Sequence, residues 1–319
     1  MKDITIGIDI GGTNTAFGFV EKNGNCIEQG KMLTNQSSEA ELFVKELYLK
    51  INEVKSSIAE NINIKGIGIG APNGNYYNGT IENAPNLKWE GTINLVNIFK
   101  NYFNLPVVLT NDANAAAMGE MYFGGAKGMK NFIVITIGTG LGSGIVVDGK
   151  VVYGHDGFAG EIGHTIVRVN GRKCGCGRRG CLETYVSATG IKRTLLNLLA
   201  DANQKSILDG VTIKNLSAKM IDEAALKGDE VAMEAFSYTG KILGEALANA
   251  VAYTSPEAIF LFGGIAQADD LILKPTIINM EKNVLDIYKG KVKVQLSALN
   301  ENDAAILGAS ALAWEELDK

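Results

Sequence analysis

One histidine and three cysteines lie within eighteen residues of this chain, which has only two histidines and four cysteines in all. They are His164, Cys174, Cys176 and Cys181. One imidazole and three thiolates suit a closed, tetrahedral zinc site. The tight spacing of Cys174-x-Cys176 disfavours a disulfide between these two residues. The stretch therefore predicts a zinc ion held by the four side chains, with three buried structural thiols as the alternative.

Four protein ligands leave no coordination position open for catalysis by the metal, so the predicted zinc is structural. Two carboxylates accompany the ligands in the sequence. Glu161 precedes His164 by three residues, and Glu183 follows Cys181 by two. These carboxylates and His164 could bind a neighbouring ligand while the metal holds their loop in place.

A second candidate site is the segment Asp9-Ile10-Gly11-Gly12-Thr13-Asn14, which joins a predicted strand at 4–10 to another at 15–20. A turn of this kind presents backbone N–H groups and a hydroxyl to an anion, and the carboxylate can hold a hydrated Mg²⁺. A plain hairpin turn would use the same residue types. The sequence alone leaves both interpretations open.

The same arrangement occurs again further along the chain. Residues 138–144 carry four glycines and a threonine between predicted strands at 132–137 and 145–147. Two Gly/Thr turns facing one cleft would hold a nucleoside triphosphate from both sides, and the repetition predicts two related lobes. The chain contains neither a G-x-x-x-x-G-K-[ST] motif nor a G-x-G-x-x-G that opens a helix, which excludes the P-loop and Rossmann types of nucleotide site.

Asp112 lies between a predicted strand at 107–109 and a predicted helix at 113–122. In this position a carboxylate could act as the general base of phosphoryl transfer, accepting the proton of the attacking hydroxyl. It could also serve as the N-cap of the helix, because Asp is a preferred capping residue. The two roles are compatible, since a helix N-terminus keeps a carboxylate ionised.

Two turns combine proline with asparagine: Pro72-Asn73-Gly74 and the segment 83–87, Asn-Ala-Pro-Asn-Leu. Rigid turns that offer amide side chains suit the recognition of neutral hydroxyl groups. Ordinary polar turns have the same composition, so the sequence leaves both interpretations of these two turns open.

The composition describes an acidic globular protein. With 319 residues the chain should form about two domains. A formal net charge of -5 argues against nucleic acid or an anionic membrane as the main partner. No charged segment followed by an apolar run opens the chain, so we expect no secretory signal and a cytoplasmic protein, where reduced thiols favour metal binding.

Strands and helices alternate along the chain, which predicts the α/β class. Further strands are expected at 64–70 and at 258–262, the latter ending in Gly263-Gly264. Helices are expected at 39–61, 95–102, 189–200, 217–227 and 230–253. A last helix should begin near Ala304, with Asn302 or Asp303 as its N-cap.

Taken together, these motifs resemble the ROK family of sugar kinases and repressors, and within it the bacterial glucokinases. The resemblance covers nearly the whole chain, and its most specific part is Glu161-x-x-His164 followed by the cysteine loop and Leu182-Glu183. It implies an actin-like, hexokinase-type (ribonuclease H-like) fold of two lobes with a central cleft. The small lobe would comprise residues 1–112 and 302–319, and the large lobe residues 113–301.

The resemblance also implies roles for the individual residues. Asp112 would be the catalytic base. Phosphate, Mg²⁺ and the nucleotide of ATP would contact Asp9, Gly11, Gly12, Thr13, Asn14, Gly138, Thr139, Gly140, Gly263 and Gly264. Sugar hydroxyls would bind Asn86, Asn111, Asp112, Glu161, His164 and Glu183. Asn73 departs from the glycine usual at its position, which leaves any contact from it open.

The implied reaction is the transfer of phosphate from ATP to the 6-hydroxyl of glucose by a homodimeric enzyme. Kinases of N-acetylmannosamine, N-acetylglucosamine or fructose are the alternatives among enzymes. A sugar-responsive repressor of the same fold is the alternative from another class. We expect the enzyme, because a strand begins by Ile4 where a repressor would carry a DNA-binding helix-turn-helix.

Overall fold

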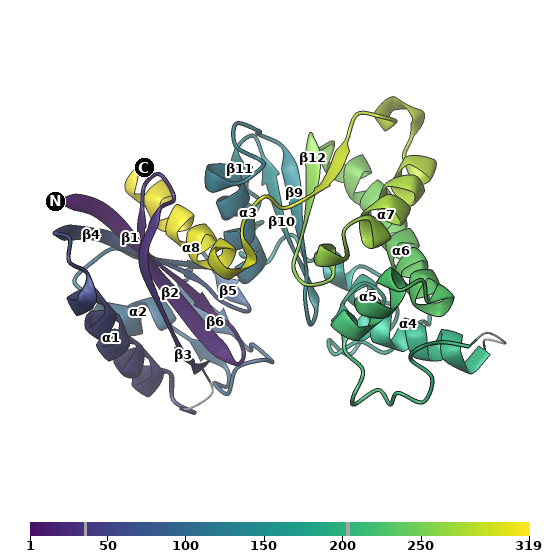
Figure 1. The fold of residues 1–319 in the computed structure, drawn as a ribbon. Helices are drawn as coiled ribbons and strands as arrows, with labels where there is room; N and C mark the ends of the chain where they lie inside the picture. Colours follow the sequence, from purple (N-terminus) through teal and green to yellow (C-terminus); the bar gives the residue numbers. More distant parts are fainter. Residues whose placement is uncertain (35–36, 202–204) are drawn as a thin grey trace.

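A computed structural model describes residues 1–34, 37–201 and 205–319 of the protein, and its main feature is a pair of five-stranded sheets (Figure 1). The first sheet has the order β3-β2-β1-β4-β8 and the second the order β11-β10-β9-β12-β13. The strands of the first sheet are β1 (Lys2–Ile10), β2 (Asn14–Glu21), β3 (Cys26–Leu33), β4 (Ile62–Gly70) and β8 (Val107–Thr110). Those of the second are β9 (Phe132–Ile137), β10 (Leu141–Val147), β11 (Lys150–Val151), β12 (Ala258–Phe262) and β13 (Lys293–Leu296).

The two sheets share one topology. In each, three consecutive strands pair antiparallel, and two later strands add in parallel on the other side of the first. The repeat inferred from the two Gly/Thr turns therefore extends to the whole sheet. Both predicted hairpins are present, and the α/β class is confirmed.

The second turn is shorter than expected. Residues 141–144, predicted as turn, form the first half of β10, so the turn consists of Gly138–Gly140 only. The glycines in β10 serve packing instead. A β carbon at Gly144 would lie 2.6 Å from the carbonyl oxygen of Ala113, so helix α3 (Asp112–Phe123) approaches the strand at a distance that only glycine permits.

Helices α3 and α8 (Glu301–Leu317) lie between the two sheets (Figure 1). Helix α8 packs on β1 and β4, α3 packs on β9 and β10, and the two helices pack on each other. The contact is close enough that a β carbon at Gly308 would lie 3.2 Å from the backbone nitrogen of Ala116. Because both sides of α3 are covered, its residues 113–120 are all buried, and four of them are alanine.

Helix α8 begins earlier than predicted. Asn302 and Asp303 lie inside its first turn, so neither is the N-cap, and the expected cap was wrong. The backbone carbonyl of Asn300 accepts the first helical hydrogen bond, from the N–H of Ala304, at 2.8 Å.

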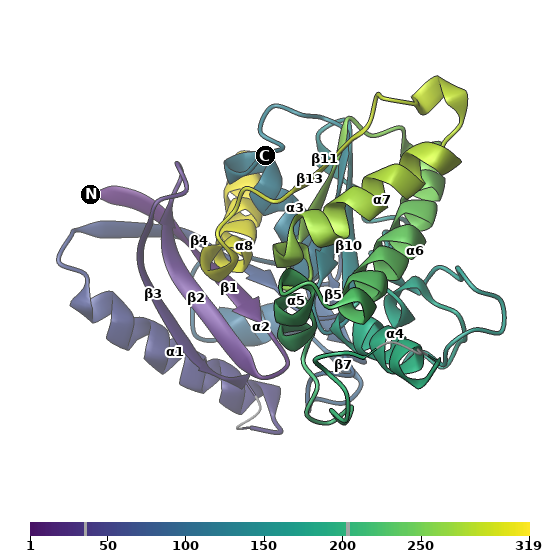
Figure 2. The same ribbon diagram turned by 45° about the vertical axis from the view of Figure 1, so that its right-hand side comes forward.

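The remaining helices cover the outer faces of the sheets (Figure 2). Helices α1 (Ala40–Ser57) and α2 (Leu95–Lys100) close the core of the first sheet. Helices α4 (Ala188–Asp201), α5 (Ala218–Leu226), α6 (Glu230–Thr254) and α7 (Asp270–Asn283) close that of the second. All but α7 were predicted, with shifted ends. A small sheet of β5 (Gly74–Asn75), β6 (Thr80–Glu82) and β7 (Thr92–Ile93) was not predicted. Among the described residues, no helix combines the length and apolar character needed to cross a membrane.

Candidate active site

Asp9 and Asp112 lie at one edge of the first sheet. Strands β1, β4 and β8 are parallel neighbours, so their carboxyl ends meet at that edge. Asp9 pairs with Gly70 of β4, which pairs in turn with Thr110 at the end of β8, two residues before Asp112. A β carbon at Gly70 would lie 3.8 Å from the Cα of Asp112. The missing side chain thus leaves room for the start of α3 beside the strand ends.

The N-cap of α3 is Asn111 and not Asp112. The Oδ1 of Asn111 accepts a hydrogen bond from the N–H of Asn114 at 2.7 Å. Asp112 is the first helical residue, and its Oδ1 accepts from the N–H of Ala113 at 2.8 Å. The capping role considered for Asp112 is therefore wrong, and Asp112 is exposed to solvent at the start of the helix.

Burial raises the pKa of both carboxylates. Desolvation raises the pKa of Asp9 to about 7, and the negative charge of Asp112 adds to the rise. Desolvation also raises the pKa of Asp112, because protein surrounds this carboxylate although water reaches it, while the N–H of Ala113 opposes the shift. A pair of carboxylates that resist ionisation together suits a divalent cation, which would stabilise both charges.

The turn of residues 11–13 joins β1 to β2 and touches a predicted sugar loop. The N–H of Gly11 donates to the carbonyl of Asn14 at 3.0 Å, and Thr13 and Asn14 are exposed. A β carbon at Gly12 would lie 2.9 Å from the carbonyl oxygen of Asn86. The exposed Asn86 is thus brought directly against the first Gly/Thr turn.

The second turn, Gly138–Gly140, closes on itself through the N–H of Gly138 and the carbonyl of Gly140, 3.0 Å apart. The turn at 263–264 lies beside it. A β carbon at Gly263 would come within 2.8 Å of the carbonyl of Ile137, and its φ of +99° is a conformation that glycine adopts readily. Gly264 is exposed. The predicted nucleotide residues of the second sheet therefore form one group.

Two short 3₁₀ helices carry the remaining candidates: η2 (Ile162–His164), preceded by Glu161, and η3 (Leu182–Thr184), which contains Glu183. Burial raises the pKa of Glu161, the imidazole of His164 lowers it, and the charges of Asp112 and Glu183 raise it further. Glu161 is therefore within electrostatic reach of Asp112 at the start of α3 and of Glu183 in η3.

The four predicted metal ligands converge. The ligand atoms of His164, Cys174, Cys176 and Cys181 all lie within 4.8 Å of one another. The Sγ atoms of Cys176 and Cys181 are 3.6 Å apart, and the Sγ of Cys174 is 3.8 Å from the Nδ1 of His164. Ligands about 2.3 Å from a tetrahedral zinc would be separated by about 3.8 Å. The donor set and its spacing fit a zinc ion.

The structure gives positioning roles to three residues, Ser143, Asn73 and Arg172, to which the sequence analysis assigned none. The hydroxyl of the buried Ser143 donates to the carbonyl of Gly160 and accepts from the N–H of Ile162, which fixes the segment around Glu161. The amide of Asn73 donates to the carbonyls of Glu82 (2.9 Å) and Asn83 (3.3 Å).

The φ of Asn73 is +50°, a conformation that glycine adopts readily and that Asn tolerates better than most other side chains. The third residue is Arg172, whose guanidinium donates to the carbonyls of Thr184 and Gly190, both at 3.0 Å. The one signal for Arg172 in the sequence is its position two residues before Cys174, the first cysteine of the cluster.

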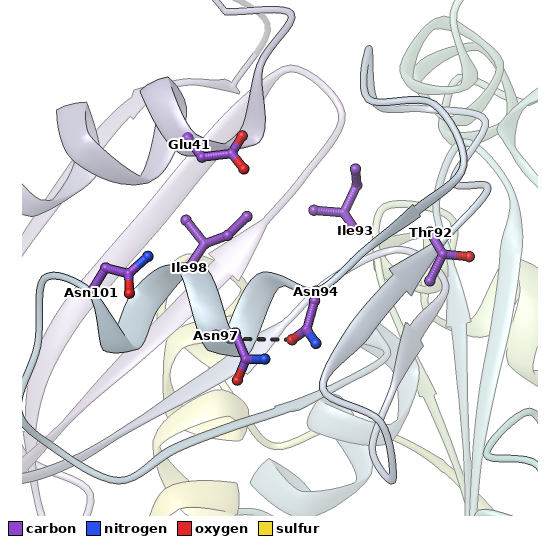
Figure 3. Close-up of a pocket in the computed structure, with 7 residues that line it drawn as sticks. All are labelled: Glu41, Thr92, Ile93, Asn94, Asn97, Ile98 and Asn101. Carbon is purple, nitrogen blue, oxygen red and sulfur yellow. Dashed lines mark hydrogen bonds between the residues drawn. The ribbon is translucent and has the colours of Figure 1, made fainter.

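A groove between α1 and α2 lies apart from these residues (Figure 3). It is lined by Glu41, Thr92, Ile93, Asn94, Asn97, Ile98 and Asn101. No residue predicted to act on substrate or nucleotide lines it. The candidate site is therefore defined by converging side chains at the ends of strands and not by this groove.

Comparison with known proteins agrees with the geometry. The chain is 33% identical over 315 residues to a glucokinase of Halalkalibacterium halodurans, covering 98% of this chain and 95% of that protein. A solved structure of a ROK family glucokinase from Streptomyces griseus, in complex with glucose and AMPPNP, superposes with a TM-score of 0.82 at 32% identity, covering 98% and 99% of the two chains.

A putative xylose repressor of Caldicellulosiruptor is 30% identical, over 98% of this chain and 79% of the repressor. The fold of the solved relatives is the actin-like, hexokinase-type fold expected from the sequence. With its family model matching residues 5–316, the chain belongs to the ROK family.

Proposed function

We propose that the protein phosphorylates the 6-hydroxyl of glucose at the expense of ATP. The observation that carries the proposal is the convergence of an exposed carboxylate at the start of α3, Asp112, with Asp9 and Glu161 from two other elements. Relatives named glucokinase match nearly the full chain, and one solved relative holds glucose with an ATP analogue.

In this mechanism Asp112 accepts the proton of the sugar hydroxyl as the oxygen attacks the γ-phosphate. The transition state of phosphoryl transfer is loose, so positioning matters more than the strength of the base. Mg²⁺, held beside Asp9, would neutralise charge on the phosphates. In the proposal, Gly11 closes the first turn through its bond to Asn14, and Gly12, Thr13, the Asn14 side chain and the Gly138-Thr139-Gly140 turn orient the phosphates. Gly263 and Gly264 would lie against the adenosine.

The sugar is held by Asn86, Asn111, Glu161, His164 and Glu183 in the same proposal. A zinc ion on His164, Cys174, Cys176 and Cys181 would keep the loop that carries these side chains in one conformation. We also propose the small lobe of residues 1–112 and 302–319, supported by the packing of α8 on β1 and β4. A large lobe of 113–301, a homodimer and a cytoplasmic location complete the proposal.

Two other functions are alternatives to glucose phosphorylation. A kinase of N-acetylmannosamine, N-acetylglucosamine or fructose would use the same catalytic residues, because the acceptor is selected by the volume around the 2-position. A sugar-responsive regulator is favoured by the putative xylose repressor, which matches 98% of this chain.

The test is an ADP-release assay of the purified protein against a panel of hexoses and N-acetylhexosamines. We expect glucose to give the highest kcat/KM and 6-deoxyglucose to give no turnover. A markedly higher kcat/KM for N-acetylmannosamine would assign the amino-sugar activity instead. Sugar binding without turnover of any acceptor would favour the regulator.

A further inference from the structure

The turn Gly138–Gly140 is held by one neighbouring segment, residues 183–189. The N–H of Ala188 donates to the carbonyl of Gly138 at 2.8 Å, and the hydroxyl of Thr189 donates to the carbonyl of Thr139 at 3.4 Å. The Oε2 of Glu183 accepts from the N–H of Leu141, the residue after the turn, at 3.1 Å. Three hydrogen bonds from a single segment therefore fix the turn.

These bonds set the direction in which the turn presents its donors. In a trans peptide the C=O and the following N–H point in opposite directions. Because the carbonyls of Gly138 and Thr139 point toward the segment 183–189, the N–H groups of Thr139 and Gly140 point away from it. An anion-binding turn works only while its N–H groups are aimed at the anion.

The same segment follows Cys181, a member of the predicted metal cluster, by two residues. The N–H and the hydroxyl of Thr184 donate to the carbonyl of Cys181, at 3.0 and 2.7 Å, and Leu182 and Thr184 are buried. The Oε1 of Glu183 lies 3.6 Å from the Sγ of Cys174. One oxygen of this carboxylate thus faces the cysteines, and the other holds the strand that follows the turn.

We propose that Glu183 is a positioning residue for the nucleotide, and that through it the metal cluster controls nucleotide affinity as well as the sugar loop. The inference rests on the proposed function, since it takes the turn 138–140 as a phosphate-binding element. Glu183, already proposed to bind sugar, would thus also orient the phosphate-binding turn in the protein without sugar.

The test is titration of the purified protein with AMPPNP and Mg²⁺ by calorimetry in the absence of sugar. Glu183→Ala should raise the Kd about tenfold, the weight of one hydrogen bond to a charged group. Glu82→Ala is the matched control: it removes another partly buried carboxylate, one that accepts hydrogen bonds from the side chains of Asn75 and Thr80 and has no role in the proposed site. Its Kd should stay within about twofold of that of the unmodified protein, since it leaves the three bonds to the turn intact.

A second variant guards against misfolding of the first. Thr189→Val keeps the shape of an exposed side chain and removes only the bond to Thr139, and it should raise the Kd by a smaller factor. Removal of bound metal with a chelator should weaken AMPPNP binding to the unmodified protein and have less effect on Glu183→Ala.

An unchanged or tighter Kd in Glu183→Ala, or equal losses in the Glu183 and Glu82 variants, would overturn the proposal. Turnover of sugars is measured separately on the unmodified protein. Failure of glucose phosphorylation with the nucleotide effect intact would reject the proposed function and leave this coupling standing.

Discussion

Asp112→Asn isolates the proton-accepting role of this side chain from its place in the fold. The substitution keeps the size of the side chain, and the amide oxygen can still accept from the N–H of Ala113. Since Asn111 caps α3, the start of the helix does not depend on Asp112. The variant should therefore fold with the helix unchanged.

The expected loss lies in the chemical step. An amide cannot take the proton of the attacking hydroxyl, so kcat should fall by about 10²–10⁴. At 1.36 kcal/mol for each factor of ten, this corresponds to about 3–5 kcal/mol on the activation barrier. Removal of the negative charge should also lower the pKa of Asp9, because the charge of Asp112 is one of the causes that raise it.

The assay measures kcat by ADP release and glucose affinity by calorimetry, with thermal unfolding as the check on folding. Glucose should bind within a few-fold of the unmodified protein. Glu161→Gln makes the same chemical change near Asp112 and should raise the KM for glucose with a much smaller loss in kcat. Near-normal turnover of Asp112→Asn, or equal losses of kcat in both variants, would remove Asp112 from the mechanism.

Three further perturbations have defined outcomes. Cys176→Ala should lower both the zinc content, measured by mass spectrometry, and glucose affinity, because loss of one of four ligands releases the loop; zinc-free protein of full activity would contradict the site. Asp9 binds its proton more tightly in the folded state, so its ionisation costs stability as the pH rises from about 4 to about 7. Asp9→Asn should flatten this part of the curve of melting temperature against pH, and it should abolish turnover. An unchanged slope would refute the raised pKa of Asp9. Arg172→Gln should raise the KM for glucose several-fold at constant zinc content, since its bond to Thr184 holds η3, with Arg172→Lys recovering part of the loss; an unchanged KM would assign Arg172 to the fold alone.

The residues at strand ends could be predicted because their chemistry and their local structure coincide. Asp9 lies near the end of a strand rich in isoleucine, and Asp112 follows the strand Val107–Thr110 by two residues. Turns after strands need glycine or a capping side chain, so position and type point to the same edge. The convergence of His164, Cys174, Cys176 and Cys181 could be predicted for a similar reason, since four rare residues lie close together in the sequence.

The rest depended on contacts between distant parts of the chain. Gly142 and Gly144 look like turn residues locally, and only the approach of α3 explains them as strand. The strands β5, β6 and β7 have two or three residues each, too few for a period of two to show. Asn111 and Asp112 have equal preference for the N-cap position, and the hydrogen bond from the N–H of Asn114 identifies Asn111 as the cap.

Helix α8 has a consequence for how the protein is made. The inner face of the first sheet is shaped for it: hydroxyls of Thr5 and Ser310 lie 2.7 Å apart, and a β carbon at Gly68 would lie 3.1 Å from the backbone nitrogen of Ala313. The strands of this sheet leave the ribosome first, while the helix that covers them is encoded after the whole second sheet. The face of the sheet that carries Thr5, Gly7 and Gly68 therefore stays uncovered through most of translation, whereas the isoleucines of β1 and β4 pack on the opposite face with α1 and α2. Contacts this distant in sequence form slowly and expose the nascent chain to aggregation. We expect synthesis in the cell to depend on chaperones that hold the first sheet until residues 301–317 arrive.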